Sequence, residues 1–124
     1  MNPLTREWLA KAGEDYDLVV SLLRRKRVPA NTLAFHAQQA AEKYLKAVLQ
    51  ERGIRFARTH DLVALLSLLG ADAGSLPLLA DDLRRLSGYA VIARSPGFNA
   101  SVREARDAAA AMKRIRGAAV VLIE

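Results

Sequence analysis

Four side chains that could hold a phosphate group or the edge of a base recur at helical spacing in the first half of the chain: His36, Gln39, Lys43 and Lys46. Together they offer an imidazole, a carboxamide and two ammonium groups over about three turns of a helix. This pattern favours an anion-binding ridge. The same stripe is also typical of a bundle helix that faces water, and Glu42 stands where it can pair with Lys46 at i,i+4.

An arginine directly before a rigid turn is the second candidate for binding. Arg94 precedes Ser95-Pro96-Gly97, and Tyr89 lies shortly before it. The guanidinium could clamp a phosphate, or it could bond the free carbonyl groups where a helix ends. We place Arg94 beside the ridge as a phosphate contact and Tyr89 beside it as a base contact.

Candidates for catalysis are fewer. His60 stands at the expected start of a helix, where it could carry a proton during a reaction or only bond the helix end. Arg55 precedes it with the spacing R-x4-H, a match that a chain with 14 Arg and two His produces readily by chance. His60 and Arg55 are therefore weak catalytic candidates.

Several classes of site lack their residues. The chain has no cysteine, which excludes disulfides, thiolate catalysis and Cys-based zinc sites. It also has no glycine-rich phosphate loop, no serine-hydrolase elbow and no H-E-x-x-H helix. Because only two histidines are present, we expect neither a metal nor a cofactor.

Five helices are predicted to position these side chains, and no segment has the pattern of a strand. Apolar steps of three or four residues, capping residues and turn glycines predict helices over about Leu4–Leu23, Thr32–Arg52, Leu62–Leu69, Ser75–Arg94 and Ser101–Ile123. Ser101 and Glu104 form a capping box at the start of the last one. We therefore expect one all-α domain over residues 1–124, an antiparallel up-and-down helical bundle of four long helices plus one short helix.

The composition fits a folded protein with an anionic partner. Of 124 residues, 52% are hydrophobic and 26% are charged, which is too apolar for a disordered tail. Nineteen Lys and Arg against thirteen Asp and Glu leave a net charge of +6, which favours nucleotides, RNA or DNA. No apolar stretch approaches the ~20 residues of a membrane span and the N-terminus does not read as a secretory signal, so we expect a cytoplasmic protein without membrane contact.

The last helix carries more apolar surface than one bundle face readily buries. It contains the alanine run Ala108–Ala111 and the apolar end Ala118–Ile123. Part of this surface is expected to meet a second copy of the chain, which predicts a homodimer.

Three motifs together resemble a known family. Residues 35–47 read FHAQQAAEKYLKA, and they are followed by Thr59-His60-Asp61-Leu62 and then by Tyr89 with the Arg94 turn. In this order and spacing, the motifs closely resemble the HEPN domain family over nearly the whole chain. The resemblance implies a helical bundle, usually a homodimer, that binds a nucleotide or RNA. It also implies a minimal nucleotidyltransferase encoded beside it, often in a toxin–antitoxin-type pair.

Other members of the family are metal-independent RNases, which this chain resembles less. They carry an R-x4-6-H motif late in the chain, so that Arg and His from two protomers face one cleft. No histidine follows His60 here, and Ser95 stands where this branch more often has an aromatic residue. We predict a HEPN domain protein that binds a nucleotide or nucleic acid and acts with a nucleotidyltransferase; a metal-independent RNase and a non-catalytic interaction module are the alternatives.

Overall fold

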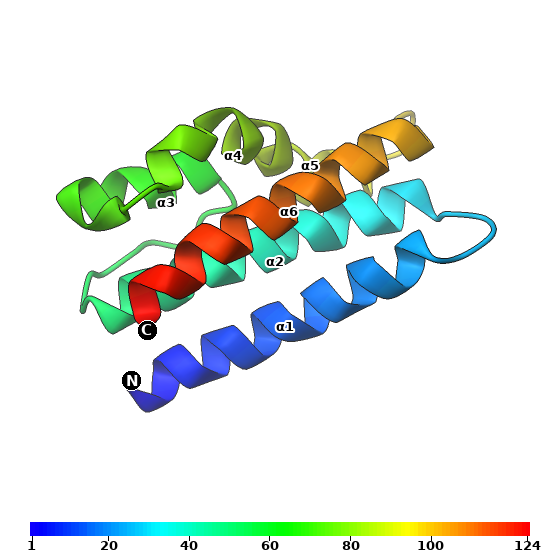
Figure 1. Ribbon diagram of the computed structural model, residues 1–124. Coiled ribbons are helices and arrows are strands. Elements are labelled where there is room, and N and C mark those ends of the chain that lie inside the picture. Colours follow the sequence, from blue (N-terminus) through cyan, green and yellow to red (C-terminus); the bar gives the residue numbers. More distant parts are fainter.

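The chain folds entirely into helices, as the computed structural model of residues 1–124 shows (Figure 1). The α-helices are α1 (Pro3–Leu23), α2 (Ala30–Glu51), α3 (Leu62–Leu69), α4 (Ala80–Ser87), α5 (Tyr89–Ile92) and α6 (Val102–Ile123). Two 3₁₀ turns, Gly70–Ala73 and Leu76–Leu79, join α3 to α4. The predicted all-α bundle is confirmed. No helix combines the length and the apolarity needed to cross a bilayer.

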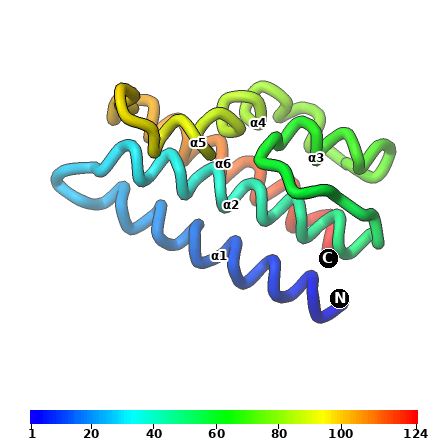
Figure 2. The backbone as a smooth tube through the Cα atoms, turned by 180° about the vertical axis from the view of Figure 1, so that it is seen from behind, coloured from blue at the N-terminus to red at the C-terminus, as the bar shows by residue number.

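Helix α2 lies at the centre of the bundle, with α1 on one side and α6 on the other (Figures 1 and 2). Helices α3, α4 and α5 form a further layer against α2 and α6. Alanines let these neighbours approach α2 closely, and five of them are fully buried: Ala34, Ala37, Ala40, Ala41 and Ala47. Beyond its first turn, α2 therefore leaves only a narrow strip partly open to solvent. Of the residues predicted to bind anions, His36, Gln39 and Lys43 lie on that strip, whereas Lys46 at its end is buried.

The second helix begins at Ala30 rather than near Thr32, and Asn31 in its first turn bonds to the loop before α6. The side-chain oxygen of Asn31 accepts the backbone N–H of Ala100 at 2.7 Å, and its amide donates to Asn99 at 3.2 Å. Pro29 precedes the helix without a side-chain cap. Asn31 thus fixes the loop before α6 to the start of α2.

The fourth predicted helix, Ser75–Arg94, is present as a 3₁₀ turn followed by two short α-helices. The segment Leu76–Leu79 forms a 3₁₀ turn around Pro77, and α4 follows directly after it. Gly88 then separates α4 from α5, since glycine is a poor helix former. With α4 and α5 counted as one interrupted helix, the bundle has the expected five helices.

An ion pair fastens α4 to α6 and predicts how stability depends on pH. Asp82 is 9% exposed and accepts two bonds from Arg114, at 2.8 Å from Nε and 2.9 Å from Nη2. Those bonds lower the pKa of Asp82 below its ordinary value of 3.8. A carboxyl whose pKa falls on folding stabilises the protein above its unfolded pKa, and this contribution is lost as pH falls through the folded pKa.

Replacing Asp82 with asparagine should therefore lower the free energy of unfolding at pH 7 by about 1 kcal/mol, because Arg114 is half-exposed and the pair is partly screened. The difference between the two proteins should shrink toward zero as pH falls below about 4. Urea unfolding at pH 7 and at pH 3 measures both. A difference that stays constant over this range would contradict the assignment.

Gly74 is held by a close approach of α6. Its φ of +54° lies in the left-handed region, and a Cβ atom there would stand 2.7 Å from Cδ2 of Leu122. Gly74→Ala should therefore lower the free energy of unfolding by about 1–2 kcal/mol.

Gly117 is the matched control, because it lies inside α6 with open space around it. Gly117→Ala should raise stability by about 0.5–1 kcal/mol, and denaturant unfolding of both variants tests the contrast.

Candidate functional site

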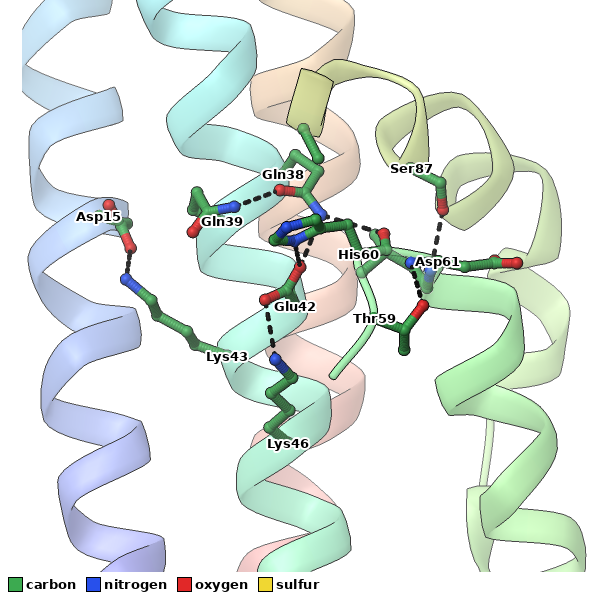
Figure 3. Close-up of polar contacts among 12 residues, drawn as sticks. Asp15, Gln38, Gln39, Glu42, Lys43, Lys46, Thr59, His60, Asp61 and Ser87 are labelled. Atoms are coloured by element: carbon green, nitrogen blue, oxygen red, sulfur yellow. Dashed lines mark hydrogen bonds and ion pairs between the residues drawn. The ribbon is translucent and has the colours of Figure 1, made fainter. Parts of the chain in front are cut away.

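A buried carboxylate on α1 organises one end of the exposed strip of α2. Asp15 is 8% exposed, although it belongs to a surface helix. Its two oxygens contact different residues of α2: Oδ1 lies 2.8 Å from Nδ1 of His36, and Oδ2 accepts from Nζ of Lys43 at 2.5 Å. Asp15 therefore ties α1 to α2 through both His36 and Lys43, and Figure 3 shows the contact with Lys43.

A second buried carboxylate organises the opposite edge of the strip. Glu42 is 4% exposed and accepts from Gln38 and Lys46, each at 3.0 Å, while its Oε1 lies 2.8 Å from Nδ1 of His60 (Figure 3). Gln38 also donates to the backbone oxygen of His60 at 3.2 Å. Glu42 and Gln38 together fix the loop that leads into α3 against α2.

The ionised form of Glu42 is the one that this network stabilises. Burial raises the pKa of Glu42, but the hydrogen bonds from Gln38, His60 and Lys46 outweigh burial and hold the pKa below its ordinary value. The carboxylate is therefore charged at neutral pH. It accepts all the bonds around it and donates none.

Lys46 is turned away from bulk solvent. Its side chain is 11% exposed, and its Nζ lies 5.4 Å from the ring centroid of Trp8 and 5.8 Å from that of Phe56. The two aromatic faces and the carboxylate of Glu42 together compensate for the water that the ammonium group loses. The i,i+4 pair of Glu42 and Lys46 seen in the sequence is thus present, and it is buried.

Arg94, which follows α5, contacts the same strip near the start of α2. Its guanidinium carbon lies 4.4 Å from the ring centroid of Phe35, and Nη2 donates to the backbone oxygen of Ala90 at 3.2 Å. The ring of Phe35 in turn meets the ring of His36 edge-on, with centroids 5.1 Å apart. Phe35 therefore joins Arg94 to the imidazole end of the strip, and Arg94 also satisfies a carbonyl at the end of α5.

The four residues predicted as a ridge lie along one side of α2, but their charged groups point in different directions. The ammonium of Lys43 turns to Asp15, and that of Lys46 turns to Glu42 on the opposite side (Figure 3). Gln39 lies between them and donates to Oε1 of Gln38 at 2.7 Å. Each lysine is neutralised by a carboxylate, whereas no carboxylate pairs with Arg94.

The remaining candidates are Tyr89, Arg55 and His60, and none of them is a residue of α2. Tyr89 lines a cavity against α6, and none of the other predicted binding residues lines that cavity. Arg55 is exposed in the loop after α2 and makes no hydrogen bond to His60. His60 itself is held by Glu42, and the cap of α3 is Asp61, which accepts from the N–H groups of Val63 and Ala64.

Two of the residues that build the site, Asp15 and Gln38, were missed in the sequence, and Glu42 was noted there only as a partner of Lys46. A signal for Asp15 was available, because it falls between Ala12 and Val19 on the stripe of α1 that faces the core. A carboxylate at a core position needs a cationic or hydrogen-bonding partner. The identity of that partner depends on how α1 meets α2, which spacing within α1 does not contain.

Two imidazoles, each held by a different carboxylate, give the site its chemical character. Because a carboxylate can only accept, these contacts assign the proton of each neutral ring to Nδ1. Nε2 of His36 and of His60 then carries a lone pair and has no hydrogen-bond partner within the chain. The side chain of His60 is 57% exposed, so its Nε2 is open to a ligand or substrate. No three His, Asp or Glu side chains form a metal-binding cluster.

Comparison with known proteins assigns the fold to a family. The HEPN domain family model matches residues 5–121, so the chain belongs to the HEPN domain family. Among solved structures, that of TT1696 from Thermus thermophilus is similar, with a TM-score of 0.83 and 25% sequence identity. The similarity covers 95% of this chain and 97% of that one. None of the curated proteins compared with the chain matches it.

Proposed function

We propose that the protein binds a nucleotide or nucleic acid on the exposed strip of α2 and acts with a minimal nucleotidyltransferase as one half of a toxin–antitoxin-type pair. The observation that carries the binding proposal is Arg94, a cation without a carboxylate partner, stacked on Phe35 beside the imidazole of His36. A guanidinium held in this way can donate to phosphate, and Phe35 and His36 offer aromatic surface to a base.

The paired lysines support binding in a different way. Their charges are compensated by Asp15 and Glu42, so they add little net attraction for an anion. They fix the two carboxylates and thereby orient the imidazoles of His36 and His60. In this proposal Arg94 supplies the phosphate contact, Gln39 and the imidazoles supply hydrogen bonds, and Lys43 and Lys46 position the site.

The binding proposal is tested by titrating a short single-stranded RNA and a mononucleotide into three proteins of equal concentration: wild type, Arg94→Gln and Arg106→Gln. Arg106 is an exposed arginine on α6, so its replacement removes the same charge elsewhere. Loss of one charge-assisted contact should weaken binding by about tenfold in Arg94→Gln only. Equal affinities in all three proteins would remove this site, and affinity independent of salt would favour a pure interaction module.

RNA cleavage is the second candidate function, because His60 has the geometry of a proton carrier. Glu42 holds its Nδ1, and its Nε2 is free and exposed. Nε2 could take the proton of a ribose 2′-hydroxyl while the 2′-oxygen attacks phosphorus, and the 5′-oxygen would leave with a proton returned to it. Incubation of RNA with EDTA should then give 2′,3′-cyclic phosphate ends that His60→Gln abolishes. Absence of such ends with the wild-type protein would discard this candidate.

Partner and assembly are proposed from family membership and from the surface. A nucleotidyltransferase is the expected partner, and a short nucleotidyltransferase gene beside this one and co-purification of the two proteins would support it. The alanines Ala108, Ala109 and Ala111 are already buried within the monomer. Leu78 and Val121 are instead 86% and 68% exposed and line one surface groove, so the proposed homodimer would use that face. Sedimentation at micromolar concentration tests it.

A further inference from the structure

The cavity that Tyr89 lines is separate from the α2 strip and lies between the α4–α5 segment and α6. It has a volume of about 330 Å³, and Leu86, Ala108 and Ala111 contribute apolar lining. The rings of Tyr89 and Phe98 also line it, with centroids 6.2 Å apart and planes tilted by 54°. The cavity therefore offers apolar side chains and two aromatic rings to whatever enters it.

The charged side chains of this cavity give it the opposite sign to the protein as a whole. Glu104 and Asp107 of α6 line it together with Arg85 of α4, so carboxylates outnumber cations in a chain of net charge +6. Glu104 accepts from the backbone N–H of Ser101 through one oxygen, and Asp107 has no hydrogen-bond partner in the chain. Burial first, and then the charges of Glu104 and Asp107, raise the pKa of Tyr89.

We propose that this cavity binds the guanidinium or ammonium group of a basic side chain presented by a protein partner. Carboxylates attract such a group, aromatic faces attract it further, and the apolar lining accommodates its alkyl stem. An anionic ligand would instead meet Glu104 and Asp107. The proposal is independent of nucleic-acid binding on α2.

The surface beside the cavity indicates a protein as the source of the cation. Ile92 lines the cavity and is 45% exposed, and its neighbour Val91 is 65% exposed on the same short helix. A free amine would not cover these apolar side chains. A protein segment that inserts a basic side chain would bury them as it docks.

The test compares two ligands of equal shape by ¹H–¹⁵N NMR on the full chain: butylguanidinium, which is charged, and butylurea, which is not. Butylguanidinium should shift the amides of Gly88, Ala108 and Ala111 saturably, and butylurea should leave them unchanged. Equal shifts with both ligands, or shifts only outside the cavity, would overturn the proposal. A capped Gly-Arg-Gly tripeptide should shift the same amides. If butylguanidinium binds and the peptide does not, the cavity takes a small cation, and the assignment of a protein partner is overturned.

Three variants separate this site from nonspecific attraction. Asp107→Asn and Phe98→Ala should each weaken butylguanidinium binding by about two- to fivefold. Arg85→Gln should strengthen it by a similar factor of about two to five, because it removes the repelling cation. A merely structural role for these residues would not produce opposite signs. Unchanged affinity in Asp107→Asn and Arg85→Gln would overturn the proposal.

Discussion

Glu42→Ala should lower the free energy of unfolding by about 3 kcal/mol or more, the largest effect expected for any single polar substitution in this chain. Glu42 is 4% exposed and is the shared acceptor for Gln38, Lys46 and His60. Its removal leaves the ammonium of Lys46 in a place where little water reaches it. Denaturant unfolding at pH 7 measures the loss directly.

A double variant separates the destabilisation caused by an unpaired buried charge from the stabilisation that the ion pair itself contributes. Glu42→Gln combined with Lys46→Met removes both charges and keeps the shape of the two side chains. It should lose clearly less stability than Glu42→Gln alone, because no buried ammonium remains without a partner. If Glu42→Gln alone is as stable as wild type, the network around Glu42 does not hold the site together.

Asp15→Asn should change stability and binding in opposite directions. Asparagine keeps an oxygen that can accept from Nδ1 of His36, but it removes the negative charge that pairs with Lys43, so the free energy of unfolding should fall by about 1–3 kcal/mol. The ammonium of Lys43 is then uncompensated and lies on the proposed binding strip. Affinity for short RNA should rise about three- to tenfold, as the gain of one phosphate contact predicts.

Asp17→Asn is the matched control for this prediction. Asp17 is an exposed carboxylate on the same helix, and its loss changes the net charge of the chain equally. It should alter affinity for RNA much less than Asp15→Asn does. Equal gains in the two variants would mean that overall charge, and not the α2 strip, governs binding.

Features set by neighbouring residues were predictable from the sequence. The capping box of Ser101 and Glu104 is present, with both of its hydrogen bonds at 3.0 Å. Gly53 and Gly70 adopt positive φ at the ends of α2 and α3. These features need only residues within a few positions of each other, so their physics is contained in a short stretch of sequence.

Features set by packing between distant segments were not predictable. The stripe of His36, Gln39, Lys43 and Lys46 was recognised, but its electrostatics depend on Asp15, which comes from another helix. Likewise the side chain of Tyr89 meets Phe98 in the cavity against α6. Sequence periodicity gives the face of a helix on which a residue lies, whereas the partner across an interface follows only from the fold.

Chemical-shift mapping with a short single-stranded RNA tests most directly whether the α2 strip is the binding surface. Addition of RNA to ¹⁵N-labelled protein should shift the amides of Phe35, Gln39, His60 and Arg94, and Arg94→Gln should suppress those shifts at the same RNA concentration. Shifts confined to the exposed basic run Arg24–Arg27, with the strip of α2 unaffected, would contradict the account.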